Sequence, residues 1–226
     1  MDKFKKDKKI IMTLTILLLV IILFTTWTTV VFAEDFVNED KTTQQDISDA
    51  YISDLKSAYV YTGKAIRPSI NMISERSNER NNGDGTITVT TYYIFLEKGR
   101  DYSVTYKNNT KIGKATVTVK GKGDYVGTQS VTYKIVPQSV GIKTLERAKK
   151  MITVRTSKAA GGCSYQIAYK ESKSKSWKYT TSKTTNKAIK HLRSGKIYFV
   201  KVRAYKKVDG RQYSGAWSKV KKIKVK

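Results

Sequence analysis

The stretch IYFVKVRAY at residues 197–205 decides the fold class, because its side chains alternate between two kinds. Every second residue from Tyr198 to Ala204 is apolar or aromatic, whereas the residues between them include Lys201 and Arg203. Successive side chains of a β-strand point to opposite faces, so a period of two indicates a strand with one face in a core and one in water. The stretch therefore predicts a half-buried antiparallel strand with a cationic outer face.

The same alternation recurs along most of the chain. Further strands are expected around residues 86–90, 102–106, 115–119, 131–135, 152–154, 165–169 and 223–225. In the first of these strands, Ile87 and Val89 would form the buried face. In the last, Val220 has the opposite parity to Ile223, which predicts a β-bulge near Lys221. Turns rich in Gly and Asn separate the strands at spacings typical of sandwiches. The predicted fold class is all-β, with two antiparallel β-sandwich domains.

The N-terminal segment has the pattern of an export signal. Residues 1–9 carry five Lys, an uncharged run extends from Ile10 to Ala33, and Val31-Phe32-Ala33 precedes Glu34 as a cleavage site would. Because the run is also long enough to span a bilayer, residues 1–33 are either a cleaved signal peptide or an anchor through residues 10–33. Both alternatives predict an extracellular or cell-surface location, with membrane contact only through this segment.

Charge and turn positions predict the remaining boundaries. Residues 34–50 hold six acids and one base, and residues 34–57 are expected to form a flexible acidic linker, with a helical turn near Asp46–Leu55. Pro137 marks the end of the first sandwich, which gives domains at residues 58–137 and 138–226.

The pattern Leu192-x-x-Gly195-x-x-Tyr198-x-Val200-x-Val202-x-Ala204 resembles the tyrosine corner and F strand of fibronectin type III domains of exported Gram-positive proteins. Tyr165–Tyr169 is similar to the C strand of that family. Residues 58–136 resemble an immunoglobulin-like repeat of bacterial surface proteins, through Gly99-Arg100-Asp101-Tyr102-Ser103-Val104 and Gly121-Lys122-Gly123-Asp124-Tyr125-Val126-Gly127. These resemblances imply an immunoglobulin-like and then a fibronectin type III-like domain, which serve as spacers and as binding modules.

Composition argues against an enzyme. The chain has one Cys and one His, so neither a Cys-cluster metal site nor a His–His acid/base pair forms within it. Cys163 and His191 are expected on strands of opposite sheets, without a third group to orient them. No catalytic site, cofactor or metal is predicted. A Lys–Asn isopeptide bond has Asn108, Asn109 and Lys120 available, but nothing in the sequence pairs them.

The candidate ligand site follows from charge. The chain carries a formal net charge of +26, and residues 138–226 hold 25 Lys and Arg against three acids, Glu146, Glu171 and Asp209. This excess is larger than solubility requires. Strand parity directs a set of cations outward from neighbouring strands, with aromatic side chains among or beside them. The predicted ligand-binding residues are Lys170, Trp177, Lys201, Arg203, Tyr205, Trp217, Lys222 and Lys224.

Three functions fit these features. The first is a non-enzymatic adhesion or scaffolding protein, secreted or at the cell surface, whose basic domain binds anionic cell-wall polymer or acidic glycan. The second is a carbohydrate-binding accessory of an extracellular hydrolase system, with sugars stacked on Trp177 and Trp217. The third is binding of extracellular DNA. A purely structural ladder of cations and rings, or lysines that only solubilise the face, remains open beside them.

Overall fold

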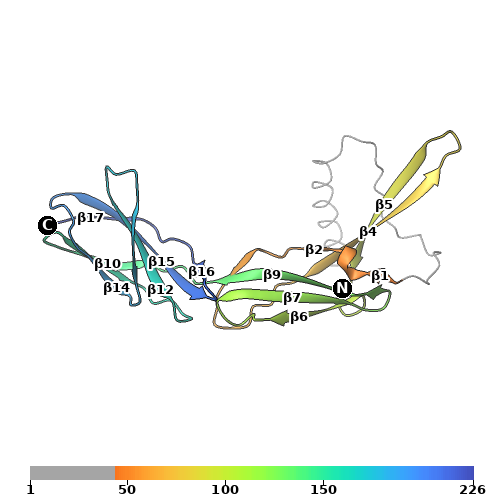
Figure 1. The fold of residues 1–226 in the computed structure, drawn as a ribbon, viewed down its shortest axis with the longest axis horizontal. Helices are drawn as coiled ribbons and strands as arrows, with labels where there is room; N and C mark the ends of the chain where they lie inside the picture. The colour runs from red at the N-terminus through yellow and green to blue at the C-terminus, as the bar shows by residue number, and fades with distance from the viewer. Residues whose placement is uncertain (1–43) are drawn as a thin grey trace, which may run out of the picture. The chain divides into compact units, whose positions relative to one another are not determined.

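The structure is a computed structural model that describes residues 44–226 (Figure 1). These residues form β-strands and one short 3-10 helix, which confirms the all-β prediction and accords with two β-sandwich domains. Within residues 44–226, no helix is long and apolar enough to cross a membrane. The predicted signal or anchor segment, residues 1–33, lies outside the described part. The described chain divides into two compact units, residues 73–96 and residues 44–72 with 97–226.

The first domain is built around a four-stranded sheet. Its strand order is β3-β9-β7-β6, in which β3 pairs with β9 in parallel and the other pairs are antiparallel. The strands are β3 (Ala58–Val60), β6 (Tyr102–Lys107), β7 (Gly113–Gly121) and β9 (Thr128–Val136). Alternate side chains of β7 and β9 are fully buried, including Val117, Val119 and Ile135. The predicted alternation at residues 115–119 and 131–135 is therefore confirmed.

Three tyrosines fasten an irregular segment, residues 61–70, to this sheet. The hydroxyl of Tyr102 donates to the carbonyl of Ile70 over 2.7 Å, and that of Tyr133 donates to Ile66 over the same distance. Tyr106 donates similarly to the carbonyl of Pro68. Each bond satisfies a backbone acceptor that has no strand partner. Burial raises the pKa of all three phenols, most directly by desolvating the charged form.

Residues 44–53 are packed, in contrast to the flexible linker that their composition suggests. They contain β1 (Gln45–Asp46), the 3-10 helix η1 (Ile47–Asp49) and β2 (Tyr51–Ser53), and β1 pairs in parallel with β8 (Tyr125–Val126). Ile47 is 0% exposed and Ala50 is also buried, so two apolar side chains hold the segment in the core. The expected helical turn is present as η1, which Asp46 caps by accepting from the Ser48 amide. The domain boundaries themselves remain predictions.

The unit of residues 73–96 is a hairpin of β4 (Asn71–Asn81) and β5 (Ile87–Leu96). Its turn contains Gly83 and Gly85, both at positive φ. The prediction that Ile87 and Val89 are buried is wrong, because they are 60% and 46% exposed. Alternation specifies which side chains share a face, but within this unit no second layer covers that face.

The C-terminal domain consists of a three-stranded and a five-stranded sheet. The smaller sheet has the order β10-β11-β14, and the larger has β13-β12-β15-β16 with β17 paired to β15. The strands are β10 (Ile142–Ala148), β11 (Met151–Thr156), β12 (Ser164–Glu171), β13 (Lys178–Ser182), β14 (Asn186–Ile189), β15 (Ile197–Val208), β16 (Arg211–Ser214) and β17 (Lys221–Lys224). Pairing of β17 with β15 is regular from Lys221 to Lys224, whereas the amide of Ser218 donates to the carbonyl of Val202, one residue out of that register. This shift accords with the predicted bulge near Lys221, and the exposed Val220 lies within it.

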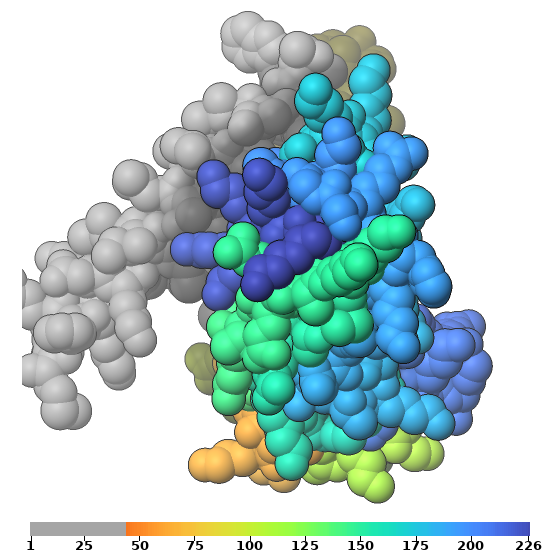
Figure 2. Space-filling model, turned by 90° about the vertical axis from the view of Figure 1, so that its left-hand side faces the viewer, coloured from red at the N-terminus to blue at the C-terminus, as the bar shows by residue number. Residues whose placement is uncertain are grey.

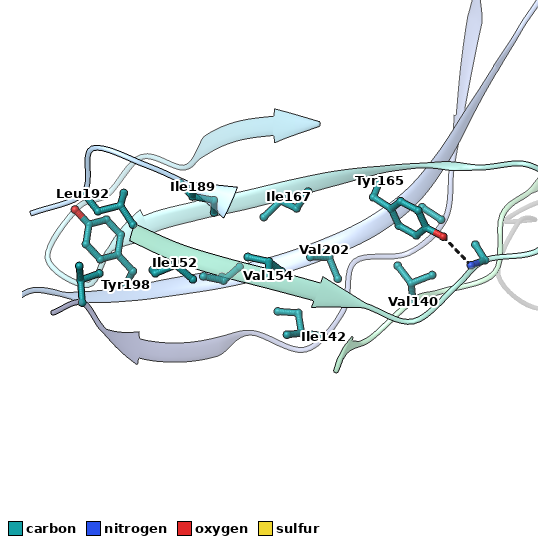
Figure 3. Packing of buried hydrophobic residues seen from close by; sticks show 14 residues of the cluster. Val140, Ile142, Ile152, Val154, Tyr165, Ile167, Ile189, Leu192, Tyr198 and Val202 are labelled. Carbon is teal, nitrogen blue, oxygen red and sulfur yellow. Dashed lines mark hydrogen bonds between the residues drawn. The ribbon is translucent and has the colours of Figure 1, made fainter. Parts of the chain in front are cut away.

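The core of this domain lies between the two sheets (Figure 3). β11 contributes Ile152 and Val154, β12 contributes Ile167, and β15 contributes Val200 and Val202, all with at most 1% exposure. Each such side chain, fully removed from water, stabilises the fold by about 1.5–3 kcal/mol relative to an exposed one.

Two tyrosine hydroxyls close the ends of this core. Tyr198 accepts a hydrogen bond from the amide of Arg193 over 3.2 Å, which is the tyrosine-corner arrangement that the resemblance implies. Tyr165 accepts from the buried amide of Ala159 over 3.0 Å, the contact drawn as a dashed line in Figure 3. Each bond fixes a loop to a strand, and in the second the loop amide is buried.

Replacing Tyr165→Phe should lower the free energy of unfolding of the C-terminal domain by about 1–3 kcal/mol, because the buried Ala159 amide loses its acceptor. Urea unfolding followed by Trp fluorescence measures this, since Trp177 and Trp217 both lie in that domain. Tyr179→Phe is the control, because Tyr179 is 57% exposed and its hydroxyl remains accessible to water. Equal stability of the two variants would contradict the role of the Tyr165 hydroxyl.

Candidate functional site

The larger sheet of the C-terminal domain presents a row of cations on its outer face. Antiparallel pairing places Ala168 beside Lys201 and Gln166 beside Arg203. It also places Phe199 beside Lys222 and Ile197 beside Lys224. Directly paired residues point to the same side of a sheet. We call this surface the cationic face and define it by Lys170, Lys201, Arg203, Lys222 and Lys224 with Trp177 and Trp217.

Five of these residues form a continuous stack of alternating cations and rings. The Nζ atom of Lys201 lies 4.5 Å from the ring centre of Trp177 and 4.9 Å from that of Trp217. Lys170 extends the stack beyond Trp177 at 5.3 Å, and Arg203 extends it beyond Trp217 at 4.4 Å. Each contact is within the range in which a ring quadrupole attracts a cation. The order of the stack is thus Lys170, Trp177, Lys201, Trp217 and Arg203.

Hydrogen bonds of the neighbouring residues Gly215 and Ser218 fix Trp217 in this stack. The amide of Ser218 donates to the Val202 carbonyl over 2.7 Å, and the Ser218 hydroxyl accepts from the Val202 amide over 3.0 Å. The amide of Gly215 donates to Ala204. A β-carbon at position 215 would lie 2.6 Å from the carbonyl oxygen of Pro137, which accounts for glycine there. The segment before β17 therefore runs beside β15 and holds the indole over its cations.

Three further side chains adjoin the stack, namely Gln166, Tyr179 and Ala168. Arg203 donates through Nε to Oε1 of Gln166 over 2.8 Å, which orients the guanidinium. The ring of Tyr179 lies 6.2 Å from that of Trp217. Ala168 is 0% exposed although it belongs to the outer face, so the stack covers this part of β12. The face is consequently part packed structure and part open surface.

No carboxylate neutralises the cationic face among residues 44–226. The ion pairs of the C-terminal domain join Arg155 to Glu146 over 3.2 Å and Arg193 to Glu171 over 3.6 Å. The third acid, Asp209, lies in the turn between β15 and β16. The field of the face is therefore that of its cations, weakened only by solvent and salt.

Seven of the eight predicted site residues define the cationic face, and the eighth, Tyr205, has the same parity on β15 as Lys201 and Arg203. Lys222 and Lys224 are exposed and make no ring contact among the described residues, whereas the stacked Lys170, Lys201 and Arg203 are half-buried. Tyr205 lies farther along β15, where it pairs with Ser164 and Ser214, and it is not part of the stack. Gln166 and Tyr179 were missed, although the parity of Gln166 with Lys170 along the same strand pointed to it.

The other candidate chemistry stays apart. Cys163 immediately precedes β12, where its thiol donates to the Ala160 carbonyl over 3.2 Å. Burial raises the pKa of this thiol, and the charge of Lys206 lowers it less. His191 follows β14 and is exposed. The amide of Asn109 donates to Ile66, and Lys120 is exposed, which offers no buried pair for an isopeptide bond. Within residues 44–226, no cluster of His, Cys, Asp or Glu is arranged for a metal ion.

Comparison with known proteins bears on the C-terminal domain. Residues 137–226 match the family model described as Cytokine receptor-like factor 2-like, D2 domain. Among solved structures, a chain of a cytokine receptor complex is 13% identical, with a TM-score of 0.42, and the match covers 69% of this chain and 90% of that one. No curated protein matches.

The C-terminal domain is thus similar to a cytokine receptor-like D2 domain of the fibronectin type III kind. Such domains are extracellular and non-enzymatic. The fibronectin type III part of the sequence resemblance is confirmed, and the Gram-positive setting remains a prediction.

A double-mutant cycle measures the coupling free energy between Arg203 and Trp217 in the stack. Arg203→Met should lower the free energy of unfolding by about 0.5–1 kcal/mol in the native sequence and by little in a Trp217→Leu background, because its ring partner is then absent. Lys207→Met serves as the control, since Lys207 is exposed on the same strand without a ring contact among the described residues. Additive effects of Arg203→Met and Trp217→Leu would contradict the coupling.

The raised pKa of Cys163 predicts slow alkylation. At pH 7.5 the thiolate fraction is smaller than that of an ordinary cysteine, so iodoacetamide should label Cys163 more slowly than it labels glutathione. The rate should rise as the pH approaches the raised pKa. Mass spectrometry over time follows both rates, and labelling as fast as glutathione at pH 7.5 would contradict the burial effect.

Proposed function

We propose that the protein is an exported, non-enzymatic adhesion or scaffolding protein whose cationic face binds anionic wall polymers or acidic glycans. The observation that carries the proposal is a sheet face with five cations and no neutralising carboxylate among the described residues. A rigid array of like charges attracts a flexible polyanion and releases its counterions on binding. The predicted signal or anchor at residues 1–33 would place such a face outside the cell.

The face divides its cations between two tasks. Lys201 and Arg203 lie against indole rings and are half-buried, so they contribute mainly to holding the surface in shape. Lys222 and Lys224 are exposed on the neighbouring strand and reach solvent freely. The exposed pair therefore supplies most of the contact with a polymer that lies across the sheet.

Sugar stacking is less well supported than charge. A sugar needs an accessible ring face, and the ring of Trp217 already carries Lys201 and Arg203, while that of Trp177 carries Lys170 and Lys201.

DNA would use the same cations as a wall polymer, and a competition assay between DNA and teichoic acid separates the two.

A protein ligand is the second candidate function. The match of residues 137–226 to a cytokine receptor-like D2 domain favours it, because that family is described as receptor-like. A receptor-type interaction would be specific to one partner and less sensitive to salt than polymer binding. Retention on walls that ignores both salt and wall polymer would favour this candidate.

Retention on purified Gram-positive cell walls tests the proposal. Lys222→Gln with Lys224→Gln should weaken retention about tenfold and make it less sensitive to salt, because two exposed phosphate contacts are lost. The matched control is Lys143→Gln with Lys149→Gln, which removes the same charge from the β10 side of the domain. Equal losses would mean that total charge decides retention. Unchanged binding to walls stripped of teichoic acid would overturn the proposal.

A further inference from the structure

A cavity distinct from the stack lies at the end of the C-terminal sandwich where β12 ends and β15 begins. It is a cavity of about 420 Å³, and its walls come from the end of β12, the turn into β13 and the segment after β14. Figure 2 faces the end of the domain that carries the chain's C-terminus. All the residues that line the cavity belong to the C-terminal sandwich, so the shape of the cavity depends on this domain alone.

The rim of this cavity is cationic. Lys170, Lys178, Lys190 and Arg193 line it, together with the single histidine of the chain, His191. Its one carboxylate, Glu171, is 3.6 Å from Arg193 and so is partly neutralised from within the rim. Four cations against one acid favour a ligand group with negative charge.

The inner wall is not cationic. The buried side chains of Leu192 and Tyr198 and the half-buried ring of Tyr169 line it. Such a wall suits the C–H face of a sugar ring, which packs on aromatic and aliphatic groups. The cavity is also larger than an inorganic anion needs and falls in the range of sites for small organic molecules.

We propose that this cavity binds one acid-bearing saccharide unit, with the ring against Tyr169 and the carboxylate or phosphate group among the rim cations. The inference rests on the proposed function and deepens it, because it names the unit of the polyanion that the domain selects. Lys170 belongs both to this rim and to the cationic face, so a polymer lying on the face reaches the cavity without a gap in positive charge.

Short defined probes test the cavity in the full chain. The probes are a hyaluronan tetrasaccharide for carboxylate sugars, a glycerol phosphate trimer linked to a hexose for phosphorylated ones, neutral cellotetraose, and inorganic phosphate. Calorimetry should give measurable affinity for at least one acidic saccharide and at least tenfold weaker binding of cellotetraose and phosphate. The tighter acidic probe identifies the source of the charge.

Matched variants locate the binding. Lys178→Gln with Lys190→Gln should weaken the acidic saccharide about tenfold, since both side chains line the cavity. Lys173→Gln with Lys175→Gln removes two cations from the turn between β12 and β13 that do not line the cavity, and it should change affinity less than twofold. Thermal unfolding confirms that both variants are folded. Equal effects of the two variants, or inorganic phosphate binding as tightly as the saccharide, would overturn the inference.

Wall retention of the same variants separates the two proposals. In one outcome the native chain is retained on walls, and the Lys178→Gln and Lys190→Gln double variant binds the saccharide as tightly as the native chain does. That outcome would overturn the proposal for the cavity and leave the proposal for the cationic face. Saccharide binding that depends on the cavity, without any wall retention, would overturn the proposed wall function and leave the cavity as a glycan site.

Discussion

The alternation of side chains along β15 couples the core of the C-terminal domain to its cationic face. Val200 and Val202 point into the core, and Lys201 and Arg203, their neighbours in sequence, point outward. A shift of one residue in register would exchange the two sets, burying the cations and exposing the valines. The cost of burying unpaired charge is far larger than any gain from the face, so the core fixes the face. β12, β16 and β17 all pair with this strand and repeat the constraint.

The apolar core and the stack of rings and cations contribute different amounts of free energy to folding. Burial of each apolar side chain contributes about 1.5–3 kcal/mol, whereas an exposed cation–π contact contributes about 0.5–1 kcal/mol. The stack therefore does not hold the sandwich together. Its effect is to order side chains that would otherwise sample many rotamers, because a lysine loses up to about 2 kcal/mol of rotamer freedom when fixed. Part of that cost is met by the protein itself before any ligand binds.

Sequence periodicity predicted the strands and the faces of the sheets, because side-chain direction in a strand depends only on parity. It therefore placed Lys201, Arg203, Lys222 and Lys224 together correctly. It failed where a second layer decides the outcome: Ile87 and Val89 alternate like core residues and yet are exposed. It also missed the packing of Ile47, since a single apolar residue within an acidic stretch carries no periodic signal.

The stacking of Trp217 between Lys201 and Arg203 and the end cavity could not be predicted from strand parity, for a related cause. Trp217 lies outside the strands and is fixed by two hydrogen bonds between Ser218 and Val202, which depend on the path of a loop. The cavity combines the turn after β12 with the segment after β14, which are separated in sequence and meet only in the folded domain.

An excess of positive charge at this density has a cost in the folded state, because compaction brings like charges together. The domain reduces that cost in three ways, through ion pairs, through contacts of cations with aromatic rings, and through screening by salt. Ion pairs use two of its three acids, Glu146 and Glu171, and aromatic rings accommodate three of its cations. Most of the remaining lysines are exposed to solvent, where salt screens them over about 8–10 Å, whereas Lys206 donates to the carbonyl of Gly161. A bound polyanion would lower the same repulsion, so its affinity and the stability of the domain are linked through one electrostatic energy. The positive charge that opposes folding is therefore also the source of the affinity for a polyanion. The stack of rings and cations holds these mutually repelling cations at fixed positions, so that they do not spread apart.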